Sequence, residues 1–295
     1  MIVSVAKVRK VVIPAAGFGT RFLPQTKAMP KEMLPVVDKP VIQYVVEEAV
    51  ASGIKDIIIV TGWYKRSVED HFDYPFELEQ RLKDWGKEKE LAEVRRIAEM
   101  ANFIYIRQKG GLGNATPVLC AKAAIGDEPF AVMWGDEFIS AKPPRLLQMI
   151  KVYEKYGHPV ISGVRVPKEN LHRYGIADLN NWKDEKNIFQ IKKIVEKPSA
   201  AEAPSNLATH GAYILPPEIF PILENLIPGK DGELWLVDAI DKLLEIEPVL
   251  ACEIENGRYY DTGNKLEYLK TVVEFALVHP ELNVPFKDYL KKLRL

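Results

Sequence analysis

The sequence predicts an α/β fold in which helices flank a mostly parallel, Rossmann-like sheet. Short apolar runs at residues 11–13, 56–62 and 130–134 have the length and composition of strands buried on both faces. Between the first two runs, residues 40–53 carry apolar side chains at helical spacing, and Gly53 offers a stop. A strand, a helix and a strand joined by short connections favour a right-handed crossover, which places the two strands parallel in one sheet.

The segment after the first strand has the composition of a phosphate-binding loop. Pro14 has no N–H to donate, so the strand is expected to end there. The small residues that follow are Ala15, Ala16, Gly17 and Gly19. Such residues let backbone N–H groups approach an anion closely, and Arg21 and Lys31 add positive charge nearby. A phosphate-handling loop is therefore predicted at the carboxyl end of the first strand.

Two common glycine-rich motifs are absent from this segment. The P-loop pattern G-x-x-x-x-G-K-[ST] does not occur, and Gly17-Phe18-Gly19 lacks the third glycine of a dinucleotide fingerprint. Taken alone, Gly-Phe-Gly is more often an ordinary turn between a strand and a loop than a nucleotide site.

The composition is that of a globular chain with balanced charge. Of 295 residues, 47% are hydrophobic and 27% are charged, and 40 Lys and Arg against 41 Asp and Glu give a net charge of −1. This balance favours neither a nucleic-acid nor a membrane partner. No apolar stretch reaches the ~18 residues of a membrane span, and the first ten residues do not have the pattern of a signal peptide. Cys120 and Cys252 lie far apart, as expected of reduced thiols in a cytoplasmic protein.

Further elements are expected along the rest of the chain. Helices are expected at residues 77–101, 115–125, 144–156, 217–226 and 233–244, with a last helix capped by Asn264. Strands are expected at residues 102–108, 160–166 and 189–195, the last in a section that looks antiparallel. Because no flexible linker divides the chain, residues 1–295 are expected to form one domain.

Polar residues stand at the ends of three predicted strands, where ligands bind in open α/β sheets. The amide of Gln108 can both donate to and accept from one edge of a pyrimidine. The carboxylate of Asp136 can hold Mg²⁺ beside a triphosphate, although a Gly-Asp pair is as often a simple turn. Glu196 and Lys197 form a charged pair at the end of the third strand, and such a pair is usually only solvated.

The string GFGTRFLPQTKAMPK, at residues 17–31, closely resembles the signature G-x-G-T-R-[hydrophobic]-x-P-x-T-x-x-x-P-K of the sugar nucleotidyltransferases. With its continuation, EMLPVVDKPVIQYVVEEA, it is most similar to the branch of bacterial UTP–glucose-1-phosphate uridylyltransferases. The resemblance extends along nearly the whole chain, through V-E-K-P at residues 195–198 and Y-D-x-G at residues 260–263.

The resemblance implies a role for each of these residues. Those implied for catalysis are Arg21, Lys31 and Lys197. Those implied for nucleotide binding are Ala15, Ala16, Gly17, Gly19, Gln108 and Gly113. Those implied for sugar binding are Gly175, Glu196 and Lys197, and those implied for Mg²⁺ are Asp136 and, from the related thymidylyltransferases, Asp261. The implied organisation is a nucleotide-binding core at 8–166, a sugar-binding part at 167–263 and a C-terminal helical segment at 264–295.

The implied reaction converts UTP and glucose 1-phosphate to UDP-glucose and pyrophosphate, in a homodimer or homotetramer. The chain departs from the family pattern at four places: residues 114–117, Trp134, Ala212 and Trp235. These departures leave a thymidylyl- or cytidylyltransferase open as an alternative. A non-catalytic sugar-nucleotide sensor is the alternative from another class, but the charged residues of the implied site disfavour it.

Overall fold

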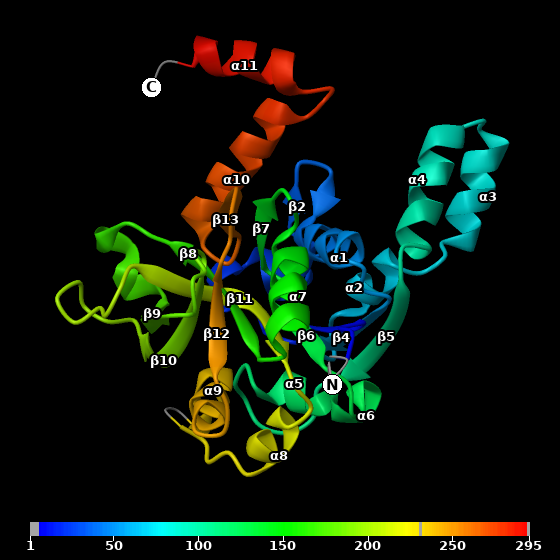
Figure 1. Ribbon diagram of the computed structural model, residues 1–295. Helices are drawn as coiled ribbons and strands as arrows, with labels where there is room; N and C mark the ends of the chain where they lie inside the picture. Colours follow the sequence, from blue (N-terminus) through cyan, green and yellow to red (C-terminus); the bar gives the residue numbers. More distant parts are fainter. Residues whose placement is uncertain (1–5, 230–231, 294–295) are drawn as a thin grey trace.

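The computed structural model describes residues 6–229 and 232–293. Within these residues, a nine-stranded sheet has the order β5-β4-β1-β6-β11-β8-β12-β10-β9 (Figure 1). Its strands are β1 (Lys10–Ala15), β4 (Asp56–Thr61), β5 (Asn102–Arg107), β6 (Phe130–Met133), β8 (Val160–Arg165), β9 (Gly175–Asn181), β10 (Ile188–Glu196), β11 (Leu207–Leu215) and β12 (Val249–Glu253). Strands β10 and β11 run against the other seven, so the sheet is mixed, with parallel pairing along β5, β4, β1 and β6 and between β8 and β12. The predicted α/β fold is confirmed.

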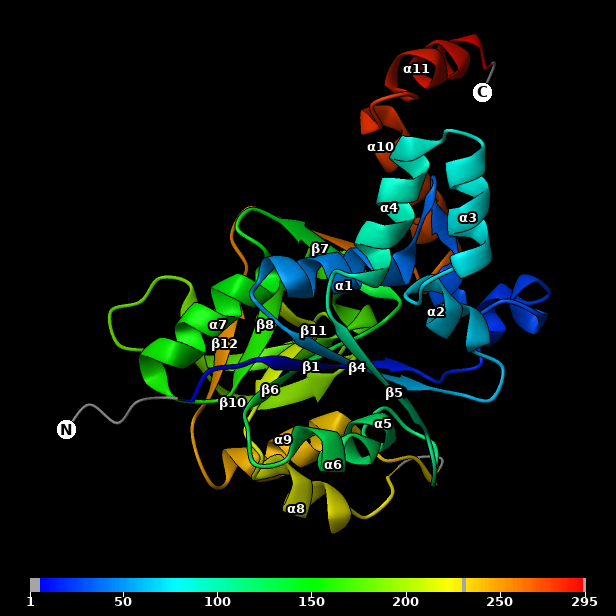
Figure 2. The same cartoon turned by 90° about the vertical axis from the view of Figure 1, so that its right-hand side faces the viewer.

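Two layers of helices cover the sheet, as Figure 2 shows. One face carries α1 (Val41–Ala51), α2 (Arg66–His71) and α7 (Arg145–Tyr156). The other carries α5 (Thr116–Cys120), α6 (Lys122–Ile125), α8 (Ile219–Glu224) and α9 (Leu236–Leu244). Side chains alternate between the layers: Ile57 and Ile59 pack on the first face, and Ile58 packs on the second. Strand β4 is apolar on both faces for this reason.

Several predicted elements have different bounds in the structure. Residues 77–101 form a hairpin of α3 (Phe76–Asp84) and α4 (Glu88–Ala98), because Gly86 turns the chain with a φ of 67°. The predicted helix at 115–125 is two short helices that meet at Ala121. The C-terminal segment is α10 (Lys265–Val278) and α11 (Asn283–Lys292).

Two local predictions at element ends have opposite outcomes. The side chain of Asn264 accepts hydrogen bonds from two backbone N–H groups of α10, so the predicted cap is confirmed. The prediction that Pro14 ends the first strand is wrong, since β1 pairs with β4 as far as Ala15. Pairing with β6 stops earlier, at Val12, so Pro14 faces a paired neighbour on one side only.

Two short ribbons lie outside the main sheet. One pairs β2 (Pro35–Val36) with β3 (Lys39–Pro40), and the other pairs β7 (Glu137–Ala141) with β13 (Gly257–Asp261). The sequence did not predict β2, β3, β7, β12 or β13. Among the described residues, no helix has the length and apolar character needed to cross a membrane. Residues 1–5, 230–231 and 294–295, which fall within the predicted domain, lie outside the described residues.

Candidate active site

The glycine-rich loop leaves β1 at Ala15 and passes beside Lys31. Gly19 has a φ of 66°, which glycine adopts without steric cost, and its carbonyl accepts a hydrogen bond of 2.7 Å from Thr26 Oγ1. A Cβ on Gly17 would lie 3.7 Å from Nζ of Lys31. The loop therefore combines an approachable backbone with a fixed ammonium, as an anion site requires.

An ion pair joins this loop to the end of β6. Nζ of Lys31 donates to Oδ2 of Asp136 at 2.5 Å. Burial acts to lower the pKa of Lys31, but the attraction of Asp136 and Glu32 together outweighs it and the pKa lies above its usual value. Burial also acts to raise the pKa of Asp136, and the attraction of Lys31 and Arg21 more than reverses that shift. Both groups are therefore charged at neutral pH.

The structure brings together the two aspartates predicted as metal ligands. Asp261 pairs with Glu137 across the β7–β13 ribbon, and Glu137 directly follows Asp136 in sequence. A Cβ on Gly263 would lie 3.3 Å from Oδ2 of Asp136, 3.3 Å from Oδ1 of Asp261 and 3.6 Å from Nη1 of Arg21. Two carboxylates and a guanidinium thus converge on one point, which the glycine keeps open.

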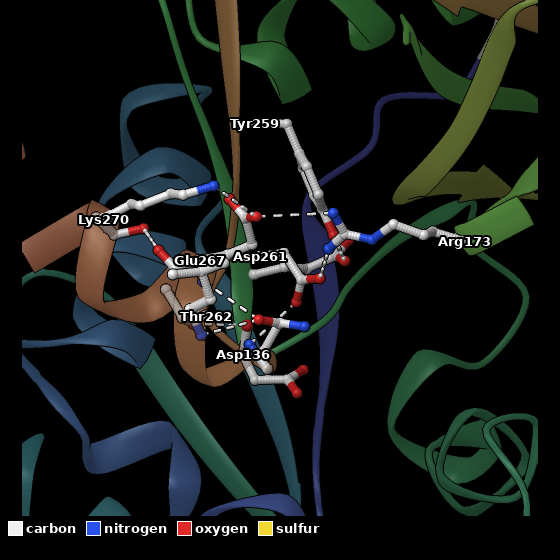
Figure 3. Close-up of polar contacts among 12 residues, drawn as sticks. Asp136, Arg173, Tyr259, Asp261, Thr262, Glu267 and Lys270 are labelled. Atoms are coloured by element: carbon white, nitrogen blue, oxygen red, sulfur yellow. Dashed lines mark hydrogen bonds and ion pairs between the residues drawn. The ribbon is translucent and has the colours of Figure 1, made fainter. Parts of the chain in front are cut away.

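Arg173, which the sequence did not single out, holds Asp261 from the other side (Figure 3). Its Nη2 donates to Oδ2 of Asp261 at 3.1 Å, and its Nη1 lies 3.7 Å from Oε1 of Glu267. Oδ1 of Asp261 accepts from the backbone N–H of Gly263 at 3.1 Å. Burial raises the pKa of Asp261, Arg173 opposes the shift, and Asp136 adds to it. The positive charge of Arg173 therefore offsets part of the negative charge of the two aspartates.

The donor set fits a hard divalent cation. Mg²⁺ is bound through one or two carboxylates together with substrate phosphates and waters, and Asp136 and Asp261 supply two carboxylates that face one point. Within residues 6–229 and 232–293, no group of three or more His, Cys, Asp or Glu side chains is placed to hold a metal. Oxygen atoms of the substrates would have to complete the coordination shell.

The predicted sugar-binding residues meet at the ends of β9 and β10. Glu196 pairs with Gly175, and a Cβ on Gly175 would lie 3.1 Å from Oε2 of Glu196 and 3.0 Å from Oγ1 of Thr209. Lys197 follows with a positive φ of 48°, and its Nζ lies 3.5 Å from Oε1 of Glu196. Its backbone N–H donates to the carbonyl of Tyr174 at 3.0 Å, which fixes the turn while the side chain stays exposed.

The predicted base-binding residues lie on a loop attached to α9. The backbone N–H of Gln108 donates to the carbonyl of Thr61, and its side-chain amide contacts the carbonyl of Gly111 at 3.4 Å. Gly113 has a φ of 112°, and a Cβ there would come within 2.2 Å of the carbonyl oxygen of Leu234. Packing against Leu234 therefore requires glycine at this position, whatever its role toward a base.

Two departures from the family pattern have a structural explanation. The side chain of Asn114 accepts a hydrogen bond of 2.7 Å from the backbone N–H of Leu236, so it ties the loop to the first turn of α9. The bulk of Trp134 is accommodated by a glycine on β11, since a Cβ on Gly211 would lie 1.8 Å from Nε1 of Trp134. Ala212 is buried, and nothing in the structure explains its replacement of the usual arginine.

A buried ion pair lies directly behind the glycine-rich loop. Nζ of Lys65 donates to Oε2 of Glu32 at 2.7 Å, and both side chains are almost fully buried. Burial raises the pKa of Glu32 and lowers that of Lys65, while their mutual attraction opposes both shifts. Sequence reasoning missed this pair because a lysine and a glutamate 33 residues apart show no pattern that distinguishes them from surface charges.

Comparisons with known proteins identify the family of this chain. The sequence profile of the family described as Nucleotidyl transferase matches residues 10–276. The UTP–glucose-1-phosphate uridylyltransferase of Bacillus subtilis is 52% identical over 287 residues, which cover 96% of this chain and 97% of that protein. The enzyme of the same name from Staphylococcus epidermidis is 47% identical, with 97% and 99% covered.

Solved structures give the same result for the fold. A UTP-bound UDP-glucose pyrophosphorylase from Acinetobacter baumannii is 41% identical and superposes with a TM-score of 0.90, covering 97% of this chain and 100% of that one. A UDP-glucose pyrophosphorylase in complex with UDP-glucose is also 41% identical, with a TM-score of 0.82 over 91% of this chain and 98% of the other. Nucleotidyltransferases of this kind typically use a divalent metal. The chain therefore belongs to the nucleotidyl transferase family.

Proposed function

We propose that this protein transfers the uridylyl group of UTP to glucose 1-phosphate, forming UDP-glucose and pyrophosphate. The observation that carries the proposal is the 52% identity, over nearly the whole of both chains, to a UTP–glucose-1-phosphate uridylyltransferase. Relatives solved with UTP and with UDP-glucose support the nucleotide substrate and the sugar-nucleotide product. These relatives do not favour a thymidylyl- or cytidylyltransferase, or a non-catalytic sensor.

The reaction places two polyanions in contact. A phosphate oxygen of glucose 1-phosphate attacks the α-phosphorus of UTP in line, and the bond from that phosphorus to the oxygen bridging the β-phosphate breaks. The electron pair leaves with pyrophosphate. No general base is needed, because the sugar phosphate is already ionised near pH 7. Alignment and neutralisation of charge are therefore the main tasks of the protein.

The charged side chains of the site suit these tasks. The backbone around Gly17 and Gly19 would cradle the triphosphate, while Arg21 and Lys31 would neutralise it and the departing pyrophosphate. Lys197 would orient the attacking phosphate, next to Glu196 and Gly175 at the sugar. The backbone of Ala15 and Ala16 lies where the loop begins, and Gln108 and Gly113 would face the base.

Asp136 and Asp261 are the residues that would hold Mg²⁺. When bound, the ion would supply positive charge to the reacting phosphates. Lys31 pairs with Asp136 and Arg173 pairs with Asp261, so each carboxylate has a cation that offsets part of its repulsion for the other. Each cation lies within ion-pair distance of one aspartate.

We further propose a homodimer or homotetramer that uses the C-terminal helices. Figure 1 shows α10 and α11 extending from the body of the molecule. Apolar side chains on and beside them are exposed, including those of Leu266, Leu269, Val278, Val284 and Tyr289. Light scattering of the full chain tests the proposal, and a monomer at micromolar concentration would contradict it.

We place the protein in the cytoplasm, because Cys120 and Cys252 are both free thiols.

Pyrophosphate release tests the proposed reaction. Five nucleoside triphosphates should be combined with several sugar 1-phosphates, with Lys31→Met as an inactive control. We expect the highest kcat/KM for UTP with glucose 1-phosphate. A higher value for another pair would assign a different transferase activity, and no turnover with any pair would favour the sensor.

A further inference from the structure

Three aromatic side chains form an exposed cluster beside the glycine-rich loop. Phe18, Trp63 and Tyr64, here called the aromatic lip, come from that loop and from the turn between β4 and α2. The rings of Phe18 and Tyr64 are stacked at 6.2 Å, and Trp63 contacts Tyr64 edge-on at 5.3 Å. Trp63 is 76% exposed and Phe18 is 59% exposed. Aromatic side chains this exposed and this close together indicate a contact surface.

The lip is attached to the loop that is proposed to bind phosphate. The hydroxyl of Tyr64 donates to the carbonyl of Gly17 at 3.0 Å. The backbone of the two segments is also in close contact, since a Cβ on Gly62 would lie 3.2 Å from the carbonyl oxygen of Ala16. A ligand on the glycine-rich loop therefore lies next to the lip.

A buried ion pair anchors the turn that carries two residues of the lip. Lys65 follows Tyr64 in sequence and pairs with Glu32, which follows Lys31. Both side chains of this pair are almost fully buried. The turn that carries Trp63 and the segment that carries Lys31 are thus joined by a contact that water does not reach. The backbone that carries Trp63 and Tyr64 is therefore held in place even though the rings are exposed.

The order of strands places the lip on the path of a bound nucleotide. Strand β4 lies between β1 and β5 in the parallel part of the sheet. The glycine-rich loop follows β1, Gln108 follows β5, and the backbone N–H of Gln108 donates to the carbonyl of Thr61, the last residue of β4. A nucleotide with its phosphates at Gly17 and its base at Gln108 has to cross the end of β4. The lip stands at that end.

We infer that the aromatic lip, with Trp63 at its tip, stacks against the pyrimidine base of the bound nucleotide. The inference rests on the nucleotide site of the proposed function and adds a residue to it. Stacking tolerates any base, because every base presents a π-face. Trp63 therefore contributes affinity for the base, whereas the amide of Gln108 distinguishes one base from another by hydrogen bonds.

Calorimetric titration of the full chain with UTP, in the absence of sugar phosphate, tests this inference. Trp63→Leu should weaken UTP binding about 10-fold, the scale of losing one stacked base, and Trp63→Phe should retain most of the affinity. Binding of inorganic tripolyphosphate should be unchanged in both variants, and so should the ratio of UTP to CTP affinity. Trp85→Leu is the matched control, since Trp85 is 63% exposed on the α3–α4 hairpin.

Two results would overturn the inference. One is an unchanged UTP affinity in Trp63→Leu, and the other is an equal loss of tripolyphosphate affinity, which would assign Trp63 to the phosphates or to the loop itself. Because Trp63 is largely exposed, its variants should unfold at the wild-type temperature. The titration needs no turnover, so a protein that binds UTP through Trp63 but releases no pyrophosphate would contradict the proposed reaction alone.

Discussion

The two ends of the candidate site are built differently. At the nucleotide end, Lys31 is paired with Asp136, and the fully buried pair of Lys65 and Glu32 lies behind it. At the sugar end, Lys197 is 60% exposed and lies 3.5 Å from a glutamate that is itself 55% exposed. Buried pairs fix the geometry before a ligand arrives, whereas an exposed pair contributes little by itself. We propose from this difference that the nucleotide end is preorganised and that the sugar end is ordered by its ligand.

The largest expected effect is on stability. Lys65→Met should lower the free energy of unfolding by about 3–5 kcal/mol, because it leaves the carboxylate of Glu32 buried without its partner. Lys197→Met should change it by less than ~1 kcal/mol, since its ion pair is exposed. Urea denaturation of both variants measures the contrast. Equal losses of stability in the two variants would contradict the claim that the nucleotide end is held by a buried pair and the sugar end by an exposed one.

The metal requirement distinguishes the two aspartates. Asp136→Asn should lower kcat about 10³-fold, as expected for losing preorganised charge at the reacting phosphates. Either Asp136→Asn or Asp261→Asn should raise the Mg²⁺ concentration needed for half-maximal rate, because each removes a negatively charged ligand. A normal Mg²⁺ requirement in Asp261→Asn, beside a raised one in Asp136→Asn, would leave Asp136 as the single protein ligand.

Lys197 tests the sugar end alone. Lys197→Ala should lower turnover at least ~10²-fold, because the attacking phosphate loses the positive charge that orients it. The affinity for UTP should change little. Lys192→Ala is the matched control, since Lys192 is an exposed lysine on β10, the strand that ends just before Lys197, and it pairs with Asp178. If Lys197→Ala weakened UTP binding as much as it lowered turnover, this lysine would have to be assigned to the nucleotide end.

The smallest expected effect concerns the choice of base. The wild-type protein should prefer UTP to CTP, because the amide of Gln108 can satisfy the uracil edge in both directions. Gln108→Ala should reduce this preference in kcat/KM. Discrimination between UTP and TTP should be weaker, since one methyl group in an apolar pocket is worth only about 1–3 kcal/mol. Comparable kcat/KM values for CTP and UTP in the wild type would contradict the role of Gln108.

Features set by neighbouring residues could be predicted from the sequence. Apolar runs such as residues 57–59 form strands buried on both faces because consecutive side chains point to opposite layers. Asn264 caps α10 because its side chain reaches N–H groups only two and three residues away. The glycine-rich signature predicted the position of the phosphate-binding loop. The small residues of this loop lie close to Lys31.

Features set by residues far apart in sequence were decided by the tertiary structure. Asp261 reaches Asp136 through the β7–β13 ribbon, whose strands are more than a hundred residues apart and were not predicted. Arg173 and the Lys65–Glu32 pair show no local pattern, because a buried charge and a surface charge look alike in sequence. Only burial requires such charges to pair, since an isolated ion cannot leave water without a large cost in free energy.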